Sequence, residues 1–533
     1  MWPAAVLIVL FFVAAFSEAR LKSPTSDEPP HIAAGLSYFV SHEIFRANPQ
    51  HPPLLKEMAA LSLMAAGVRW PNTPDANYLI KGDDPMRIFG LAWPIGDQLI
   101  WQNGPDRTLL WARLPMILTG ALLGVVVLLW TRQLFGAIAA AGAVLVFALD
   151  PTVLAHTQFV TTDVGAATFA LLTLFAVWNY MRRPTKLRLA LSGLALGAAL
   201  TAKFSNLFLL PILGLLMLAA LRWPMETAKR PTVRSLAIAL AAMGATAFVF
   251  VQATYFFPGD LMMYEKCARM VNADHNPDYV MFLAGETRHH FPTYFLYAYL
   301  LKEPIAAIVL AGVGLVALAR TRQVAMLTKL FLLVPPAVFF LSVSAMADNL
   351  GVRYLIPTLA FTYVLAGLGV ATLIQAGGKA RWAAAGLCAW LAIAAVGIYP
   401  DHLSYFNEAA CVLTEPSRIG FDGGTRCGTE WLEDSNVDWG QGFKQLKWWL
   451  DRNAPGQRIK LAYTTSFAPE AYGINCEHLQ MVDLAKEPEP GLYVVSAHLV
   501  ARTPALTRAA DWLRFTKPVA IVGHALYVYD IRR

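Results

Sequence analysis

Long apolar runs recur along the chain and leave few architectures open. A helix needs roughly 20 apolar residues to cross a bilayer. Only 15% of the residues are charged and 56% are hydrophobic, a balance typical of a multi-span membrane protein rather than a soluble one. None of the runs alternates like a barrel strand, so we expect helical spans. About eleven such spans are predicted: 1–16, 108–131, 134–149, 164–181, 187–202, 204–222, 235–254, 296–319, 329–347, 354–375 and 382–399.

The first run, 1–16, is short and could be a secretory signal peptide with FSEAR as its cleavage site. It lacks the basic residues with which such a signal begins. We therefore expect it to stay in the protein as the first membrane span, with the N-terminus in the cytoplasm.

The positions of Lys and Arg predict the orientation of these spans. With a cytoplasmic N-terminus, every connection that falls inside carries an excess of basic residues, and the only acid among them is Glu226. This pattern obeys the positive-inside rule. The segments 17–107, 255–295 and 400–533 then lie outside. The formal net charge of +7 follows from this orientation and gives no reason to expect nucleic acid as a partner.

The first outer segment contains two amphipathic patterns. Apolar residues recur at helical spacing in 31–45 and in 53–68, and each stretch is too polar on one side to span. We expect both to be helices that lie in the membrane interface. The stretch 70–106 is rich in Pro, Asn, Asp and Gly and is predicted to be mostly irregular.

Hydropathy falls after Pro400, where a soluble unit begins. A helix is predicted at 444–452, and strands are predicted at 458–465, 491–500 and 519–531. The sequence therefore predicts two domains, a transmembrane domain over 1–399 and a small outer α/β domain over 400–533.

Four cysteines fall in the predicted outer compartment: Cys267, Cys411, Cys427 and Cys476. An oxidising exterior permits a disulfide, and Cys411 with Cys427 is one pair that could form. Spacing does not determine pairing, so free thiols are an equally open reading.

Three acids at the predicted outer surface are candidates for chemistry. Asp27 and Glu28 follow the first span directly, and Asp163 begins the fourth span. The structural reading is helix capping, since Thr25 to Glu28 fits a capping box that is followed by prolines. The functional reading is a general base held at the membrane surface, able to take a proton from a hydroxyl group. The two readings are compatible, because a cap also fixes the direction of the carboxylates.

Three cations are predicted at outer ends of spans or on an interfacial helix. They are Lys56 in HPPLLK, Lys203 in LTAKFSN and Arg353 in NLGVRYLIP. Each could be a snorkelling side chain that touches lipid without specificity. The alternative is binding of one particular lipid phosphate. His51, also in HPPLLK, is weak evidence by itself.

The stretch DSNVDWGQ after the last span is rich in polar side chains. Such a run is usually a turn followed by a helix cap. Asp434, Asn436, Asp438 and Gln441 could instead bind a sugar or calcium with Trp439 stacked beside them, although the spacing does not fit an EF-hand.

The order of these motifs resembles the GT-C membrane glycosyltransferases. The acid pair after span one, HPPLLK in the same loop and D-V-G in the next outer loop are most similar to the protein O-mannosyltransferase group, glycosyltransferase family 39. That group includes bacterial aminoarabinose transferases. RYLIP, YLLKEPI, YFNEAA and DSNVDWGQGFKQL resemble stretches of its bacterial members. The chain departs from the eukaryotic pattern at Leu55, where those enzymes carry glycine before the lysine, and it lacks sugar-binding MIR repeats.

The resemblance implies an α-helical polytopic membrane protein of GT-C type. It would transfer a sugar, with inversion, from a polyprenyl-phosphate donor to a lipid, glycan or protein acceptor, among membrane lipids. The expected location is a bacterial inner membrane, with the active site and C-terminal domain in the periplasm. The resemblance assigns catalytic roles to Asp27, Glu28 and Asp163, lipid-phosphate binding to Lys56, Arg353 and Lys203, and a donor or acceptor contact to His51.

No metal or other cofactor is expected, because no His, Asp and Cys cluster shows an obvious ligand spacing. Two other classes stay open, a transporter or flippase of a lipid-linked substrate and a non-catalytic scaffold. Transporters usually place charges near the midplane of the membrane. The predicted spans here are nearly free of acids, which favours chemistry at the surface.

Overall fold

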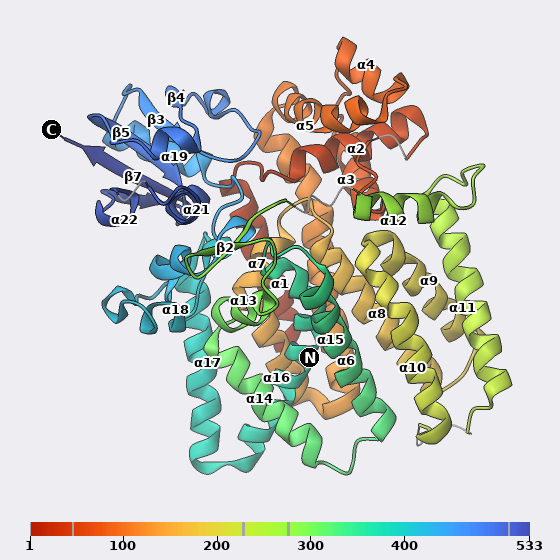
Figure 1. Ribbon diagram of the computed structural model, residues 1–533. Helices are drawn as coiled ribbons and strands as arrows, with labels where there is room; N and C mark the ends of the chain where they lie inside the picture. The colour runs from red at the N-terminus through yellow and green to blue at the C-terminus, as the bar shows by residue number, and fades with distance from the viewer. Residues whose placement is uncertain (1, 45–46, 226–229, 274–277, 510–511, 533) are drawn as a thin grey trace.

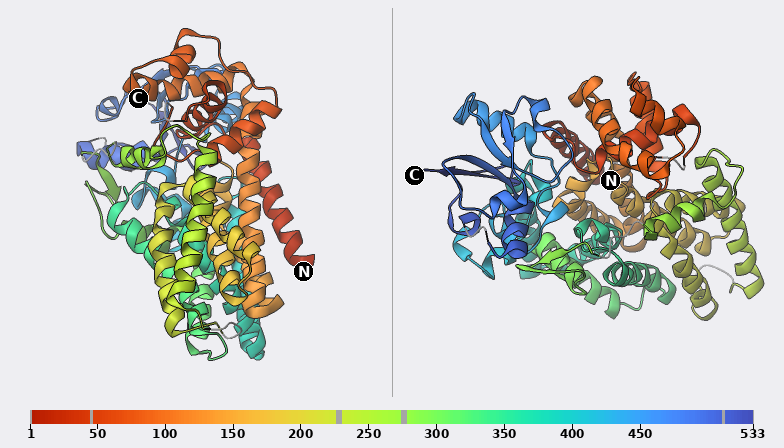
Figure 2. Two further views of the ribbon diagram at one scale, coloured as in Figure 1. Left: turned by 90° about the vertical axis from the view of Figure 1, so that its right-hand side faces the viewer. Right: turned by 45° about the horizontal axis from the view of Figure 1, so that its top comes forward.

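The computed structural model describes residues 2–44, 47–225, 230–273, 278–509 and 512–532; Glu226 of the predicted internal connection lies outside these ranges. A bundle of long helices carries two smaller layers at one end. The helices of residues 28–102 form one layer and the C-terminal sheet forms the other, and they lie side by side above the bundle (Figures 1 and 2).

Eight helical segments in the described residues are long and apolar enough to cross a membrane, or nine if the bent pair α13 (Tyr294–Lys302) and α14 (Ile305–Arg320) counts as one. The chain is thus a mostly helical multi-span membrane protein. The other long helices are α1 (Trp2–Leu21), α6 (Pro105–Ala148), α8 (Asp163–Arg182), α9 (Lys186–Ala202), α10 (Leu209–Arg222), α11 (Val233–Thr254), α15 (Met326–Met346), α16 (Ile356–Ala376) and α17 (Gly378–Ile398).

The count differs from the eleven predicted spans for two reasons. The predicted spans 108–131 and 134–149 are the two halves of α6, which counts as one segment although its halves fold back on each other at Gly136, where a Cβ atom on Gly124 would lie 2.6 Å from Phe147 Cε1. Glycine tolerates the positive φ of 87° at this break, so the chain changes direction without a loop. Helix α9 has only 17 residues and is marginal in length for a span.

The first outer segment is more helical than predicted. Helices α2 (Glu28–Ser41) and α3 (Leu54–Ala65) match the two amphipathic patterns. Helix α2 is buried from Glu28 to Tyr38 against α3 and α5, so it is not a surface helix. The prediction of an irregular 70–106 is wrong, because α4 (Pro74–Lys81) and α5 (Pro85–Gln102) fill it. The Thr-Pro and Asp-Pro pairs there are helix starts, since Thr73 and Asp84 accept N-cap hydrogen bonds and proline occupies the first turn.

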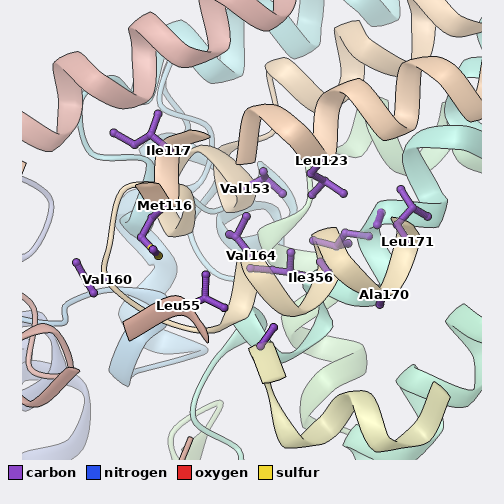
Figure 3. Close-up of a cluster of buried hydrophobic side chains, with 14 of the residues drawn as sticks. Leu55, Met116, Ile117, Leu123, Val153, Val160, Val164, Ala170, Leu171 and Ile356 are labelled. Atoms are coloured by element: carbon purple, nitrogen blue, oxygen red, sulfur yellow. The ribbon is translucent and has the colours of Figure 1, made fainter. Parts of the chain in front are cut away.

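A buried apolar cluster joins the outer helices to the bundle below the site. Leu55 of α3, Val153 of α7 (Pro151–Thr157), Val164 of α8 and Ile356 of α16 meet there (Figure 3). A Cβ atom on Gly165 would lie only 2.8 Å from Leu55 Cδ1, so the glycine of the D-V-G motif allows α3 to pack against the start of α8. This packing fixes the position of Asp163, which begins α8.

The C-terminal sheet is mixed and has five strands in the order β4-β3-β5-β7-β6. They are β3 (Ile459–Ala462), β4 (Cys476–His478), β5 (Gly491–Ser496), β6 (Ala520–Val522) and β7 (Leu526–Ile531), with α19 (Phe443–Asn453) as the predicted helix. Strand β4 was not predicted. The predicted strand 491–500 ends at Ser496, whose hydroxyl caps helix α21 (Ala497–Thr507).

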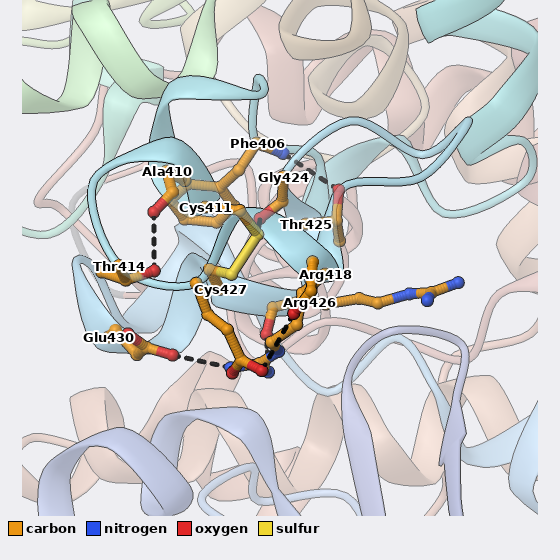
Figure 4. Close-up of a disulfide and its surroundings, with 12 residues drawn as sticks. Phe406, Ala410, Cys411, Thr414, Arg418, Gly424, Thr425, Arg426, Cys427 and Glu430 are labelled. Carbon is orange, nitrogen blue, oxygen red and sulfur yellow. Dashed lines mark hydrogen bonds and ion pairs between the residues drawn. A yellow bond between two sulfur atoms is a disulfide. The ribbon is translucent and has the colours of Figure 1, made fainter.

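A short segment with several 3₁₀ turns connects the last span to this sheet. Its Cys411 and Cys427 form a disulfide, with Cα atoms 5.3 Å apart, which joins α18 (Ala409–Val412) to the 3₁₀ helix η5 (Thr425–Glu430) (Figure 4). Of the two readings that the sequence left open for this pair, the structure shows the bonded one. The remaining elements are α12 (Met263–Ala273), α20 (Met481–Leu484), α22 (Trp512–Phe515) and the hairpin β1 (Met281–Leu283) and β2 (Glu286–Arg288).

Candidate functional site

A cavity of about 390 Å³ lies where the bundle end, the first outer segment and the C-terminal domain meet. This volume is in the range of small-molecule sites. All three parts of the chain contribute side chains to it, and most of the lining residues have polar side chains. The lining residues are Ser26, Asp27, Tyr279, Asp348, Leu350, Arg353, Asp434, Asp438, Trp439, Thr464 and His498.

An ionic cluster forms the membrane side of this cavity. Arg353 Nη1 donates to Asp27 Oδ2 at 2.9 Å and lies 4.0 Å from Asp163 Oδ2. Lys203 Nζ donates to Asp163 Oδ1 at 2.5 Å. The structure therefore brings together two of the three acids and two of the three cations that the sequence singled out, although Asp27 and Arg353 are 326 residues apart.

Helix ends place these four side chains. Asp163 is the first residue of α8, Lys203 follows the last residue of α9, and Arg353 lies in the 3₁₀ turn η2 (Val352–Leu355) before α16. The N-terminus of α8 also favours a negative charge at Asp163. Asp163 is 3% exposed, whereas the Asp27 side chain is 36% exposed. Of the two acids, Asp27 is therefore the one that a substrate can reach.

Arg353 keeps unused capacity to bind an anion. Its Nε atom is buried and has no hydrogen-bond partner among the described residues. Its guanidinium group lies 4.2 Å from the ring centroid of Trp439, which holds the group flat against the cavity wall. Buried polar groups normally find a partner, so the unpaired donor is consistent with a site for an oxygen-rich ligand.

Glu28 has a different environment from its neighbour Asp27. Its carboxylate is fully buried and accepts two hydrogen bonds from Arg113, Nε to Oε1 at 2.8 Å and Nη2 to Oε2 at 2.7 Å. Thr25 N and Val160 N also donate to it, at 2.9 and 3.1 Å. The Thr25 contact is one half of the expected capping box, and Asp27 itself makes no capping bond. Glu28 thus anchors the segment that carries Asp27.

Arg113 completes this anchor from within α6. Its other hydrogen bonds go to the carbonyl oxygens of Ala19 at 2.7 Å, Lys22 at 3.2 Å and Ser23 at 2.8 Å. One guanidinium group therefore binds both the end of α1 and the start of α2. The sequence analysis missed Arg113, although an arginine inside a predicted span is a recognisable signal of a functional or structural charge.

Lys56 does not line the cavity that holds Asp27. Its Nζ donates to Asn48 O at 2.6 Å, Asn48 Oδ1 at 3.2 Å, His51 O at 2.8 Å and Tyr38 Oη at 3.2 Å. Burial lowers the pKa of Lys56 to about 7. The ring of His51 lies edge-on to that of His31 at 5.3 Å, and burial lowers the pKa of His51 well below its usual value. Lys56 thus fixes the loop before α3.

The DSNVDWGQ stretch serves both structure and cavity. Asn436 Oδ1 accepts from Val352 N at 2.9 Å and thereby holds the turn that carries Arg353. Asp434, Asp438 and Trp439 face the cavity. Burial raises the pKa of Asp438 to about 6 and also raises that of Asp434. The expected helix cap is not formed, because α19 begins after Gly442 without a side-chain cap.

Two further motifs are linked by hydrogen bonds to one another and to the DSNVDWGQ stretch. Lys302 of YLLKEPI donates to Leu403 O at 2.8 Å and Asn436 O at 2.6 Å. Asn407 of YFNEAA donates to Glu303 O at 2.7 Å. These motifs therefore bind one another, and neither Lys302 nor Asn407 lines the cavity.

His156, in α7, and Gln158, the residue that follows α7, are buried polar residues that were not predicted from the sequence as part of a site. His156 Nδ1 and both side-chain polar atoms of Gln158 have no hydrogen-bond partner among the described residues. The His156 ring lies 6.0 Å from that of Trp439. Unsatisfied polar groups this close to Asp163 extend the polar region of the site beneath Trp439.

Comparison with known proteins agrees with the motifs. Residues 6–259 match the family model of dolichyl-phosphate-mannose-protein mannosyltransferases. No curated protein sequence matches the chain significantly. The apo crystal structure of ArnT from Cupriavidus metallidurans is 13% identical, with a TM-score of 0.51, over 99% of this chain and 97% of that chain.

Two other solved structures are more distant. ArnT from the same organism bound to undecaprenyl phosphate gives a TM-score of 0.47 at 13% identity, over 99% of this chain and 98% of that chain. Archaeal oligosaccharyltransferase AglB from Archaeoglobus fulgidus, in complex with an inhibitory peptide and a dolichol-phosphate, gives 0.46 at 10% identity, over 92% and 69%. Of these three structures, apo ArnT is similar enough to show a shared fold. The resemblance that the motifs predicted is confirmed, since residues 6–259 match the protein mannosyltransferase family model and the chain shares the fold of apo ArnT.

Proposed function

We propose that the protein is an inverting glycosyltransferase that moves a sugar from a polyprenyl-phosphate donor to an acceptor hydroxyl at the extracytoplasmic face of the membrane. One observation carries this proposal. A reachable carboxylate, Asp27, lies in a cavity at the end of the helical bundle, 2.9 Å from a cation that has an unused donor. Base and anion site are thus adjacent at one end of the helical bundle.

In this proposal Asp27 takes the proton of the acceptor hydroxyl as its oxygen attacks the anomeric carbon. The bond from that carbon to the phosphate oxygen breaks, and its electron pair leaves with the polyprenyl phosphate. Arg353 and Lys203 stabilise the charge that gathers on the phosphate. Asp163 holds both cations in place through its two carboxylate oxygens. A single displacement of this kind inverts the anomeric carbon.

Glu28, Lys56 and His51 act as supports in this scheme. Glu28 fixes the backbone next to Asp27 through Arg113. Lys56 was expected to bind the lipid phosphate. Its ammonium group already donates to four oxygen atoms, which favours a role in holding the loop that contains His51. His51 lies in that loop and does not line the Asp27 cavity.

The part of the cavity wall that the DSNVDWGQ stretch forms suits a polyhydroxyl ligand. Asp434 and Asp438 offer carboxylate oxygens to sugar hydroxyl groups, and Trp439 offers an aromatic face. The chemistry of the wall is compatible with mannose, another hexose or a modified pentose, and with a lipid, glycan or protein acceptor. A periplasmic location in a bacterial inner membrane is part of the same proposal.

The test uses the full chain in lipid nanodiscs with radiolabelled polyprenyl-phosphate sugars, and it measures donor consumption. The variant Asp27→Asn should lower the rate by at least about 100-fold, the usual contribution of a general base. The matched control Asp75→Asn removes a carboxylate from an exposed pair with Arg87 and should keep the rate.

One result would contradict the role of Asp27, and another would contradict the enzymatic function. An unchanged rate in Asp27→Asn removes this residue as the base. If the wild-type protein consumes none of the donors but moves one of them across a vesicle membrane, the protein is a transporter of lipid-linked substrates.

A further inference from the structure

A group of three metal-ligand side chains lies on the C-terminal sheet, outside the cavity described above. They are Glu470 of the 3₁₀ helix η7 (Pro469–Tyr472) and Cys476 and His478 of β4. Their ligand atoms all lie within 4.8 Å of one another. Cys476 Sγ is 3.2 Å from Glu470 Oε1 and 3.8 Å from His478 Nε2, and His478 Nε2 is in hydrogen-bond contact with the same glutamate oxygen.

The backbone explains why these side chains meet. Cys476 and His478 are two residues apart on a strand, so both point to the same face of the sheet. Strand β4 lies at the edge of the sheet, where only β3 pairs with it. Gly473, with a φ of 71°, turns the chain so that Glu470 faces the strand that follows. The ring of Tyr463, 5.6 Å from that of His478, supports the imidazole from the side.

We propose that Glu470, Cys476 and His478 form a binding site for a zinc ion. A thiolate, an imidazole and a carboxylate are the ligands that zinc uses in proteins, at bond lengths of about 2.0–2.3 Å. In a tetrahedral site such bonds place ligand atoms roughly 3.3–3.6 Å apart. The two distances from Cys476 Sγ, 3.2 and 3.8 Å, lie close to that range, so only the histidine and glutamate need to move apart.

The ligand set also distinguishes among metals. Sulfur and nitrogen ligands disfavour magnesium and calcium, which prefer oxygen. All three residues are partly or fully exposed, so water can take the fourth position. Burial and the neighbouring Glu470 raise the pKa of Cys476 to about 12. Zinc must therefore displace the thiol proton, and binding weakens as the pH falls.

A zinc ion here would fix the connection between β3 and β4, which is residues 463–475. Thr464, near its start, lines the Asp27 cavity. Phe467 stacks on Trp101 of α5 with ring centroids 4.9 Å apart, so the connection also touches the first outer segment. The ion would hold one wall of the cavity against both neighbouring parts of the chain. The site itself does not depend on the function proposed above.

The experiment titrates purified full-length protein in detergent with Zn²⁺ by calorimetry, and with Co²⁺ by absorption in the near ultraviolet, where a cobalt–thiolate band reports sulfur ligation. Wild-type protein should bind one ion of each. Cys476→Ser should abolish the cobalt–thiolate band, and both Cys476→Ser and His478→Ala should weaken Zn²⁺ binding by roughly 100-fold or more, since even losing an outer-shell partner costs 10–100-fold. The matched control Cys388→Ser removes a free thiol in the last span and should bind as the wild type does.

A second measurement needs no variant. Zn²⁺ should protect Cys476 from a maleimide reagent and slow proteolysis within residues 463–475, and a chelator should reverse both effects. Absence of Zn²⁺ binding by the wild type overturns the proposal. Binding that is equal in Cys476→Ser and the wild type overturns it as well, because the ion then lies elsewhere.

Discussion

The buried pair of Glu28 and Arg113 gives a prediction whose size can be worked from the structure. Both side chains are fully buried, and the carboxylate accepts five hydrogen bonds, two of them from Arg113, two from Thr25 and one from Val160. Glu28→Gln keeps the shape but removes the charge. Whichever way the amide turns, its NH₂ group faces at least two donors. Breaking one side of a buried ion pair costs about 3–5 kcal/mol.

The assay is unfolding of the detergent-solubilised protein by SDS, followed by tryptophan fluorescence, for the free energy of unfolding. The matched control is Asp75→Asn, since Asp75 pairs with Arg87 and both side chains are more than half exposed. An exposed pair contributes about 1 kcal/mol or less. The double variant Glu28→Met with Arg113→Met should lose less than the two single changes together, because it leaves no unpaired charge.

Activity separates Glu28 from Asp27. Glu28→Gln should lose both stability and transfer activity, whereas Asp27→Asn should lose activity and keep most of its stability. The reasoning is refuted if Glu28→Gln and Asp75→Asn lower the free energy of unfolding equally. In that case Glu28 does not anchor the segment before α2.

Three further predictions address the donor site, the docking of the C-terminal domain and the disulfide. Arg353→Lys should lower kcat/KM for the donor about 10–100-fold through a higher KM, because lysine lacks the Nε donor and the planar fork; an unchanged KM would exclude Arg353 from phosphate binding. Burial lowers the pKa of His524, but hydrogen bonds to Asp401 and Asp422 outweigh it and raise the pKa to about 9. Its stabilising effect, up to about 3 kcal/mol, is complete below about pH 6.5 and disappears as the pH rises through 9, and thermal unfolding of His524→Gln should lack this dependence. Cys411→Ser opens a loop with a sequence separation of 16 and should lower the free energy of unfolding by about 3 kcal/mol. A reductant should lower the stability of the wild type by the same amount and leave that of the variant unchanged.

Some parts of the site could be predicted from the sequence because each depends on a short stretch. Asp27, Asp163, Lys203 and Arg353 stand next to apolar runs, and the end of a span is recognisable from local composition. The individual roles could not be predicted in this way. Glu28 is adjacent to Asp27 in the chain, yet Arg113 pairs with it and burial removes it from the cavity. Neighbours in sequence acquired opposite roles because their side chains point to different partners.

Local sequence also failed to predict the structure of residues 70–106 and 491–500. Pro and Asp in residues 70–106 predicted loops, but these residues are the starts of helices, and only the packing of α5 on α2 makes that choice. The stretch 491–500 reads as one strand, yet the hydroxyl of Ser496 caps a helix that begins there. Local propensity leaves both outcomes close in free energy, so tertiary packing decides between them.

The sequence by itself determined that this chain is a multi-span helical membrane protein, and it predicts which ends of the spans face outward. Both follow from transfer of contiguous side chains between water and lipid, which depends on composition alone. Only the tertiary structure decided which charges meet. The partner and the exposure of each charge depend on distances of a few ångströms between segments up to several hundred residues apart, and Coulomb attraction acts on those distances and not on chain position.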